Sequence, residues 1–517
     1  SKKILLQFQG IVILAGAIVP GKYVRGTPIS RREVDDIINT APQTIPILCG
    51  GWAIRGWRHE GWSAIRVGLF LAHHDLDATL DYFLKTGLFS HKKRNHLQWD
   101  KWALAGAKSK AITHHPDFPE PLIMEIELYQ GCVRFKRGCR FCIEPKKGVP
   151  INRTLDSVLS EIYAALDSGI KNIRIGGATC IYTWLAEGVG ELEYPRPNPD
   201  PIIELLTTIR ADKRVELLHV DNANPSIIAS NLERAEPITK VLAETLTDGA
   251  VLSFGLESAD PDVHNKNWLN CDSEQFKIAV RHINKYGSKR GKRGLPKLLP
   301  GVNLIAGLHG ESDQTWEHNL QLFKEIIDEG LLIRRVNIRQ VEGRGFPEIN
   351  SKRFSKAKKT LREVVDAPML EKIAPIGQIL KKVRWETHND RIRRPKEVEG
   401  DSSRDDACRG KPGVTFGRQA GAYPILIGVP YLIPLESTSD IIVTGHGFRS
   451  ITGVEIGLDP LNVTKAQLKA IPGIGEKRAW KMISERAHAK GKGFETPKGF
   501  SIYNEENVRP WLDLVMK

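Results

Sequence analysis

The chain has 517 residues, more than one hydrophobic core supports, so three or four domains are expected. With 75 Lys and Arg against 61 Asp and Glu, it carries a formal charge of +14, which favours a polyanionic partner, nucleic acid first. The longest apolar run, residues 11–20, is too short to span a bilayer, so no membrane partner is expected.

The seven cysteines do not form the pattern of a disulfide framework, because three are clustered and four are scattered. No signal peptide is visible in the sequence. Together these features predict a protein of the reducing cytoplasm. The scattered cysteines are Cys49, Cys180, Cys271 and Cys408.

Residues 1–115 alternate strand, helix and strand, which predicts a small Rossmann-like α/β domain. Strands are expected at 10–19 and 45–49. Between them, Ser30 and Glu33 have the spacing of a capping box at the start of a helix.

An alternating segment at 123–128 predicts a strand, and three cysteines follow it with six and then two residues between them: Cys132, Cys139 and Cys142. Thiolates this close favour zinc, copper or an iron–sulfur centre. A structural zinc site needs four closed ligands, and no fourth Cys or His lies nearby in the sequence. Three cysteines on a four-iron cluster leave one iron open to a substrate or cofactor. The missing fourth ligand therefore indicates a cluster that takes part in a reaction. Inert thiols are the weaker alternative.

The same spacing occurs in the structural cluster of the helix-hairpin-helix DNA glycosylases, which the loop resembles in part. In that family a fourth cysteine follows after five more residues. Gly148 stands at this position here, so the resemblance ends at three ligands.

Between 123 and about 340 the sequence alternates strands with helices, which predicts a parallel α/β barrel within a domain at 116–345. Polar or glycine residues follow nearly every strand. A parallel barrel collects its active site at these carboxyl ends. The six expected strands lie at 123–128, 172–175, 215–220, 250–254, 301–307 and 332–341.

The segments after the barrel are basic or glycine-rich. Residues 346–412 predict a charged, irregular connector, in which Arg393 and Arg394 favour phosphate contact over a purely solvated linker. Residues 413–457 show short strands with glycine turns, which predict a small β-barrel-like module that contacts RNA.

Residues 458–517 predict two helices joined by a tight hairpin at 472–475, with Thr464 as the cap of the first. Glycines there let backbone N–H groups converge on a phosphate at a helix N-terminus. The segment resembles the helix-hairpin-helix motif, which grips nucleic-acid backbones without reading sequence. A hairpin used only for protein contacts is the alternative. The candidate nucleic-acid contacts are Gly473, Gly475, Lys477 and Arg478.

The barrel and its cysteine loop resemble the radical S-adenosylmethionine (radical SAM) superfamily. In that superfamily a partial six-stranded barrel carries a three-cysteine loop after its first strand, and an aromatic residue precedes the last cysteine, as Phe141 does. The resemblance implies a [4Fe-4S] cluster on Cys132, Cys139 and Cys142, with S-adenosylmethionine at the open iron. The family usually has three residues between the first two cysteines, so the six found here are a departure.

The same resemblance implies residues that bind S-adenosylmethionine. Gly176 and Gly177 sit where the family binds the methionyl amino group, although Ala178 replaces the expected acidic residue. Glu257 and Ser258 fit the strand that contacts the ribose. The fifth and sixth strands supply the remaining candidates, Asn303, Gly307 and Asn337.

Longer stretches resemble archaeal radical enzymes with a C-terminal helix-hairpin-helix, a family that includes the radical subunit of archaeosine synthase. The resemblance implies a tRNA-modifying C–N lyase. A lysine-transferring partner subunit first attaches lysine to a deazaguanine in the D-arm, and this enzyme then breaks the lysine C–N bond to leave archaeosine. An electron donor such as a ferredoxin is also implied. The matching stretches lie at 19–23, 221–225, 254–260, 295–301, 334–340 and the terminal hairpin.

Acceptors and donors at strand ends are the candidate substrate groups. Asp221, with the adjacent Asn222, or Glu127 would hold the lysine ammonium, and Arg339 or Arg335 its carboxylate. A salt bridge within the barrel is an equal alternative for each. Beside the cysteines, the candidate catalytic side chains are Asp221 and Glu257.

Three other interpretations stay open. A tRNA methylthiotransferase needs a second cluster from N-terminal cysteines, and residues 1–115 hold only Cys49. A cobalamin-dependent methylase would explain the first domain, but the Asp-x-His-x-x-Gly signature of one cobalamin class is absent. Outside enzymology, the chain could be a helix-hairpin-helix nucleic-acid-binding protein whose iron–sulfur cluster is only structural.

Overall fold

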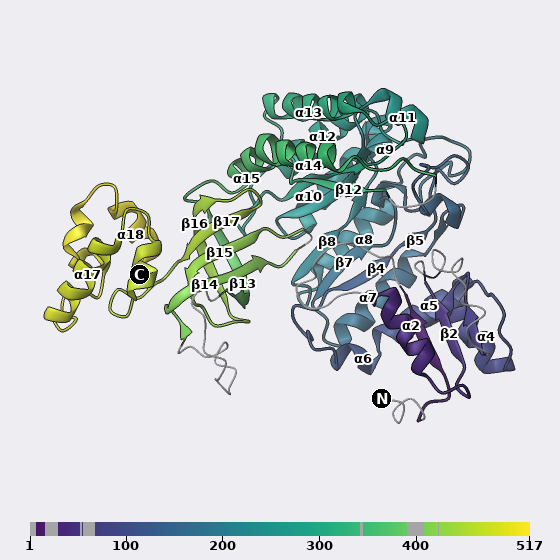
Figure 1. The fold of residues 1–517 in the computed structure, drawn as a ribbon, viewed down its shortest axis with the longest axis horizontal. Coiled ribbons are helices and arrows are strands. Elements are labelled where there is room, and N and C mark those ends of the chain that lie inside the picture. The colour runs from purple at the N-terminus through teal and green to yellow at the C-terminus, as the bar shows by residue number, and fades with distance from the viewer. Residues whose placement is uncertain are drawn as a thin grey trace. The chain divides into compact units, whose positions relative to one another are not determined.

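The computed structural model describes residues 7–15, 29–51, 54, 68–341, 345–389, 408–421 and 423–516. The chain divides into two compact units, Ser1–Ser109 and Lys110–Lys517 (Figure 1). The stretch at 19–23, Arg393 and Arg394 lie outside the described residues.

The first unit contains the predicted strand–helix–strand arrangement. Its strands β1, β2 and β3 form one parallel sheet in that order. The predicted capping box is confirmed, because Ser30 and Glu33 exchange both cap hydrogen bonds at the start of α2. The elements are β1 (Ile11–Leu14), α2 (Arg31–Thr40), β2 (Ile47–Gly50), β3 (Leu69–Leu71), α4 (Leu76–Thr86) and α5 (His96–Ala107).

The second unit starts with the short helix α6 (Lys110–Thr113) and then contains the six predicted parallel strands, of which the third is interrupted at Asp221. The Asp221 amide donates to the Ile175 carbonyl at 3.0 Å, and its carbonyl accepts from the Ser253 amide at 2.6 Å. This residue therefore joins two hydrogen-bonded sheets into one parallel series. The strands are β4 (Met124–Glu127), β7 (Asn172–Gly176), β8 (Leu217–Val220) with β9 (Asn222–Ala223), β10 (Ala250–Glu257), β11 (Leu298–Ala306) and β12 (Val336–Gln340).

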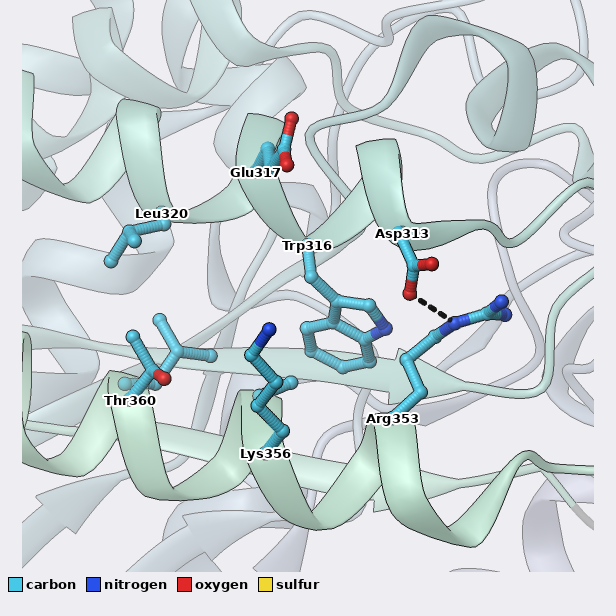
Figure 2. A pocket seen from close by; sticks show the side chains of 9 residues that line it. Asp313, Trp316, Glu317, Leu320, Arg353, Lys356 and Thr360 are labelled. Atoms are coloured by element: carbon cyan, nitrogen blue, oxygen red, sulfur yellow. Dashed lines mark hydrogen bonds and ion pairs between the residues drawn. The ribbon is translucent and has the colours of Figure 1, made fainter.

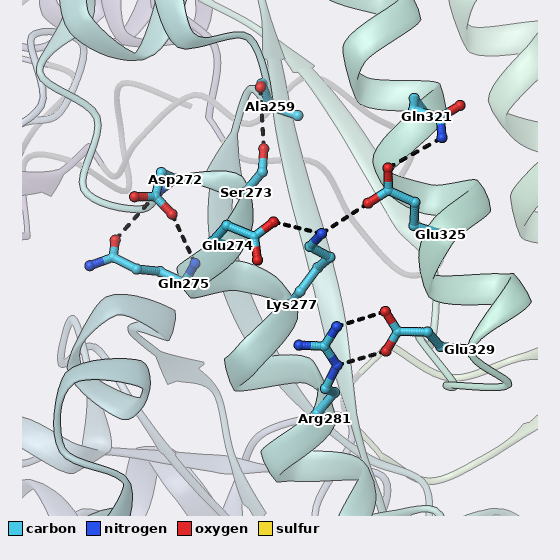
Figure 3. Close-up of polar contacts among 10 residues, drawn as sticks. All are labelled: Ala259, Asp272, Ser273, Glu274, Gln275, Lys277, Arg281, Gln321, Glu325 and Glu329. Carbon is cyan, nitrogen blue, oxygen red and sulfur yellow. Dashed lines mark hydrogen bonds and ion pairs between the residues drawn. The ribbon is translucent and has the colours of Figure 1, made fainter.

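Amphipathic helices pack on these strands. In α12 (Ser273–Gly287), apolar residues recur at helical spacing and are fully buried, among them Phe276, Val280 and Ile283. Its outer face is tied to α13 (Asp313–Asp328) by Lys277 with Glu325 and Arg281 with Glu329, at 3.0 and 2.6 Å (Figure 3). These pairs are partly exposed, so each is worth at most about 1 kcal/mol. The other helices are α7 (Leu155–Asp167), α8 (Pro199–Ala211), α9 (Pro225–Ser230), α10 (Leu232–Thr245) and α11 (Pro261–Asn267).

The connector predicted to be irregular at 346–412 is largely structured, which corrects that expectation. Buried Val383 and Trp385 alternate with the more exposed Lys382 and Arg384, so β13 has a strand pattern that the run of basic residues obscures. The elements here are α14 (Ser351–Leu361), a π-helix η5 (Arg362–Asp366), α15 (Ala367–Ile373) and β13 (Ile379–His388).

Strand β13 is also the first strand of the predicted small β-barrel, which is therefore confirmed but starts earlier than expected. The barrel is closed in the order β13-β14-β15-β17-β16. Neighbouring strands pair antiparallel except β15 and β17, which are parallel. The remaining strands are β14 (Pro412–Gln419), β15 (Leu426–Tyr431), β16 (Thr438–His446) and β17 (Ser450–Glu455).

Two helices with a tight turn follow, as predicted. Thr464 caps α16 (Lys465–Ala470), and Gly475 is the N-cap of α17 (Glu476–His488). Their apolar residues, with those of α18 (Arg509–Val515), share one buried core with the β-barrel. Of the helices in the described ranges, none has the length and apolar run that a bilayer crossing requires.

Candidate functional site

The cysteine loop leaves the carboxyl end of β4 through a glycine. Gly131 has φ +104°, and a Cβ there would lie 2.6 Å from the Gly148 carbonyl oxygen. The Cys132 amide donates to that same oxygen at 3.1 Å. Only glycine allows this close approach, which folds the loop back on itself.

The three loop thiols lie near one another in a largely buried setting. Burial raises the pKa of the Cys139 thiol to about 12 and that of Cys142 to about 11, and each feels the charge of its neighbours. Burial also raises the pKa of Cys132. Such thiols become thiolates when a bound cation stabilises the charge.

Within the described part of the chain, no three His, Cys, Asp or Glu side chains are placed to hold a single metal ion. In an iron–sulfur cluster each cysteine binds a different iron, so its thiolates need not converge on one point. The donor set of three thiols therefore fits a cluster.

The six-residue insert between Cys132 and Cys139 is anchored on both sides. The Arg134 amide contacts the Cys132 sulfur at 3.4 Å, and its guanidinium contacts the Cys139 sulfur at 3.5 Å and the Trp268 carbonyl at 3.0 Å. The Lys136 ammonium donates to the Gly190 carbonyl at 2.7 Å. Arg134 thus lies against two of the sulfur atoms, a role that the spacing alone did not predict.

Trp268 forms the rim of this loop. Its φ of +53° is unusual for a bulky residue, and the side chain is partly exposed. The guanidinium carbons of Arg140 and Arg137 lie 4.5 and 5.2 Å from its ring centroid. Phe141, the aromatic before the last cysteine, packs against a small apolar cluster that includes Val263 and Leu308.

The glycine pair after β7 is brought beside two carboxylates of β4. A Cβ on Gly176 would lie 2.7 Å from the Glu125 carboxyl carbon, and one on Gly177 would lie 3.1 Å from Glu127 Cγ. Gly177 also has φ +71°. A side chain at either glycine would crowd the glutamates of β4, so the glycines let the end of β7 lie close against that strand.

Glu257 ends β10 in a strained, half-buried position. It has φ +64°, and its Oε2 has no hydrogen-bond partner among the described residues. Burial raises its pKa to about 8, against the opposing charge of Arg339. Its charge in turn raises the pKa of Cys139 and Cys142, which shows that the carboxyl lies near them. Strain and an orphaned polar atom are features of functional sites.

The adjacent Ser258 uses its hydroxyl inside the protein. The oxygen accepts from the Asp260 amide at 3.2 Å and shapes the turn into α11. The side chain is buried.

Asp221 and Asn222 are engaged within the barrel. Asp221 pairs with Arg174 of β7 at 2.5 Å, and Asn222 donates to the Ala178 carbonyl at 3.0 Å. The structural alternative considered for Asp221, a salt bridge within the barrel, is thus present.

The fifth and sixth strands place three further candidates. The Asn337 amide donates to the Asn303 side chain at 3.1 Å. Gly307 has φ +87°, and its N–H donates to the Glu311 carboxylate at 2.5 Å. Gly307 directly follows β11 and Arg339 lies in the carboxyl half of β12, whereas Asn337 is the second residue of that strand, next to its amino end.

Arg335 is separated from this group. It precedes the first residue of β12, at the opposite end of the strand, and its guanidinium lies 4.3 Å from the ring centroid of Tyr423. Arg335 and Arg339, the two alternatives for the substrate carboxylate, thus lie at opposite ends of β12.

The predicted nucleic-acid residues of the terminal hairpin differ in availability. Arg478 donates to the Gly473 carbonyl and to the Glu505 carboxylate, each at 2.5 Å. Lys477 is exposed. Gly473 has φ +84°, whereas Gly475 has an ordinary negative φ.

A separate groove lies between α13 and α14 (Figure 2). Trp316 projects into it and donates to the Glu311 carboxylate at 3.1 Å, while Asp313 and Arg353 pair at 2.7 Å across the seam. The groove contains none of the cysteine-loop residues. It marks the packing of α14 against α13.

Comparison with known proteins identifies the family. Residues 126–323 match the model of the Radical SAM superfamily. An uncharacterized protein of Methanocaldococcus jannaschii, MJ0274, is 34% identical over 473 residues, which cover 87% of this chain and 82% of that protein. The chain belongs to the radical SAM superfamily, in the same family as MJ0274. Its cofactors are S-adenosylmethionine and a [4Fe-4S] cluster.

Two more distant likenesses extend over parts of this radical SAM protein. The tRNA-2-methylthio-N(6)-dimethylallyladenosine synthase of Histophilus somni is 22% identical over 241 residues, 45% of each chain. The structure of the radical SAM methyltransferase TsrM from Kitasatospora setae has a TM-score of 0.42 at 12% identity, covering 65% of this chain and 63% of that one.

Proposed function

We propose that this radical SAM protein modifies tRNA, breaking the lysine C–N bond of a lysine-substituted deazaguanine in the D-arm to form archaeosine. The observation that carries the proposal is the convergence of the cysteine loop, Glu257 and Arg339 at one end of a barrel whose chain continues into a closed β-barrel and basic terminal helices. The named tRNA-modifying relative supports tRNA as the substrate class.

The cysteine loop would hold the cluster through Cys132, Cys139 and Cys142. Arg134 would keep a positive guanidinium beside the thiolates, where it offsets part of the negative charge of the cluster. Phe141 would fix the loop against α11. The backbone of Gly176 and Gly177 would contact the methionyl group, and Asn303, Asn337 and Gly307 would line the rest of the S-adenosylmethionine site.

When bound, the cofactor pair would supply a deoxyadenosyl radical able to take a hydrogen atom from the lysine carbon beside the amidine nitrogen. The chain's own task is to orient the substrate and exclude water. Glu257, whose pKa of about 8 keeps it largely protonated near neutral pH, would donate a hydrogen bond from its carboxyl to the ribose or the substrate.

The lysine part of the substrate would bind charged groups at the strand ends. Glu127 and Asp221 are both candidates for its ammonium: Glu127 accepts from the Gln130 side-chain amide at 3.3 Å, and Asp221 pairs with Arg174. Arg339 is the better candidate for its carboxylate, because Arg335 lies at the far end of β12.

The macromolecular partners would bind outside the barrel. The β-barrel and the exposed Lys477 would contact the tRNA backbone, with Gly473 and Gly475 shaping the turn. A lysine-transferring subunit would make the substrate, and a ferredoxin-like donor would supply the electron.

The direct test uses cluster-loaded protein under anaerobic, reducing conditions with lysine-modified tRNA. Mass spectrometry of the digested tRNA should show archaeosine appearing as the lysine-modified nucleoside disappears. An active preparation that forms deoxyadenosine but no archaeosine would refute the specific reaction while leaving the radical SAM chemistry intact.

Methylthiolation of tRNA is the second candidate, and the relative from Histophilus somni favours it. Residues 1–115 supply only Cys49, which is buried, so a second N-terminal cluster has too few cysteines in this sequence. A methylthio-adenosine product in the same experiment would favour this alternative.

A further inference from the structure

Basic side chains converge around one buried carboxylate at the amino end of β12. The start of this strand, the π-helix η5 and the turn between β16 and β17 meet at Asp366. Two neighbouring cavities open here and share Asp366 and Arg449 in their walls. The basic residues that line them are Arg334, Arg335, Lys358, Arg362 and Arg449.

The charges in this cluster do not balance. Among the described lining residues, Asp366 is the one carboxylate against five cations. It accepts the Val336 amide at 2.9 Å and lies 3.6 Å from the Arg449 guanidinium. Buried like charges without enough counter-charge are unfavourable, and an added anion would relieve them.

Desolvation and the excess of positive charge lower the pKa of the two arginines at the start of β12. Arg334 and Arg335 are half-buried, and desolvation with the charge of neighbouring arginines, Arg449 among them, lowers the pKa of Arg335 to about 10 and that of Arg334 to about 9. Their polar contacts are neutral: Arg334 donates to the Tyr423 carbonyl at 2.8 Å, and Arg335 stacks on the Tyr423 ring. These contacts hold the side chains in place without neutralising them.

The backbone around the cluster is also specialised. A π-helix, a rare element that is frequent at functional sites, interrupts the helical run between α14 and α15 and carries both Arg362 and Asp366. Beside it, the β16–β17 turn presents Phe448, which is 59% exposed, next to Arg449. An exposed aromatic ring next to guanidinium groups matches what nucleic-acid binding sites offer to a base and its phosphate.

We propose that this cluster binds a phosphodiester group of the RNA substrate, with Arg449 and Arg362 on the phosphate and Phe448 against a neighbouring base. The inference rests on the proposed RNA substrate. The cluster lies at the amino end of β12, whereas the cysteine loop lies at the carboxyl ends of the barrel strands. It would therefore bind a part of the RNA that is distant from the reacting nucleotide.

The test measures tRNA binding by the full-length protein over a series of salt concentrations. The double variant Arg449→Gln/Arg362→Gln should lower the slope of log K against log salt by about 1–2 and weaken binding about tenfold near 0.1 M salt. Phe448→Ala should weaken binding and leave the slope unchanged, because it removes no charge. Arg281→Gln, on the outer face of α12 (Figure 3), is the matched control and should behave as the wild type.

Deoxyadenosine formation without RNA should be unchanged in these variants, and their unfolding midpoints should match the control. A slope equal to that of Arg281→Gln would overturn the proposal. Binding of inorganic phosphate at the cluster without any loss of tRNA affinity would also overturn the proposal, because the site would then bind free phosphate and not the RNA. Binding is measured whether or not archaeosine forms, so failure of the proposed reaction would leave this result interpretable.

Discussion

At the residue scale, the cysteine loop concentrates the chemistry in a few buried groups. The Cys139 sulfur contacts the Arg134 guanidinium. Burial raises the pKa of its thiol to about 12, and the charge of Glu257 adds to this increase. It is thus poorly suited to act as a free nucleophile and well suited to bind a cation.

Replacing Cys139 by Ala should remove both the visible absorption of the reconstituted cluster and deoxyadenosine formation. Cys408→Ala, a buried cysteine outside the barrel, is the matched control and should retain both. Cluster-dependent S-adenosylmethionine cleavage that persists in the Cys139 variant would disprove the ligand assignment.

His219 should make the protein sensitive to mild acid. It is buried on β8, and burial together with the charge of Arg293 and Arg174 lowers its pKa to about 3. Below the unfolded pKa of about 6.5, the unfolded chain binds a proton that the folded chain does not, so stability is lost as pH falls. Between pH 7.5 and 5.5 the wild type should lose about 1.4 kcal/mol more unfolding free energy than His219→Gln. Equal losses in urea titrations would contradict this.

Single residues show where sequence reasoning reaches its limit. The cysteines and the glycines were predictable because their chemistry and backbone freedom are local properties. Arg134, Trp268 and the partner of Asp221 were not, because each depends on a side chain that tertiary folding brings from elsewhere.

At the element scale, segments with a periodic apolar pattern were predictable, whereas a strand with a basic composition was not. The six barrel strands were expected because each carries its own apolar pattern. Strand β13 was missed because Val383 and Trp385 are buried by barrel closure, while the surrounding basic residues dominate the local composition.

The turn between α16 and α17 gives a test at this scale. Gly473→Ala should lower the free energy of unfolding by about 1–2 kcal/mol, because φ is +84° and the new Cβ would lie 3.1 Å from Val508. Gly475→Ala meets open space at a negative φ and should cost less than about 1 kcal/mol, roughly the N-cap preference. Urea unfolding compares the two variants, and equal costs would contradict the left-handed conformation of Gly473.

At the scale of the whole molecule, the terminal helices and the β-barrel are one structural body. Val454 of β17 and Leu468 of α16 belong to the same buried core, with Leu299 of the radical SAM barrel. The parts proposed to bind RNA and the reaction site are therefore linked through packing as well as through the chain.

Removing residues 457–517 should for this reason destabilise the β-barrel and cause aggregation, beyond any loss of RNA affinity. Size-exclusion chromatography and thermal unfolding would measure this against the full chain. A monodisperse truncated protein with an unchanged unfolding midpoint would contradict the shared core.

The most direct test of the proposed reaction is isotope transfer from the substrate. Lysine-modified tRNA carrying deuterium on the lysine carbon beside the amidine nitrogen should yield deoxyadenosine that contains deuterium, together with archaeosine. Unlabelled deoxyadenosine formed alongside archaeosine would contradict hydrogen abstraction at that carbon.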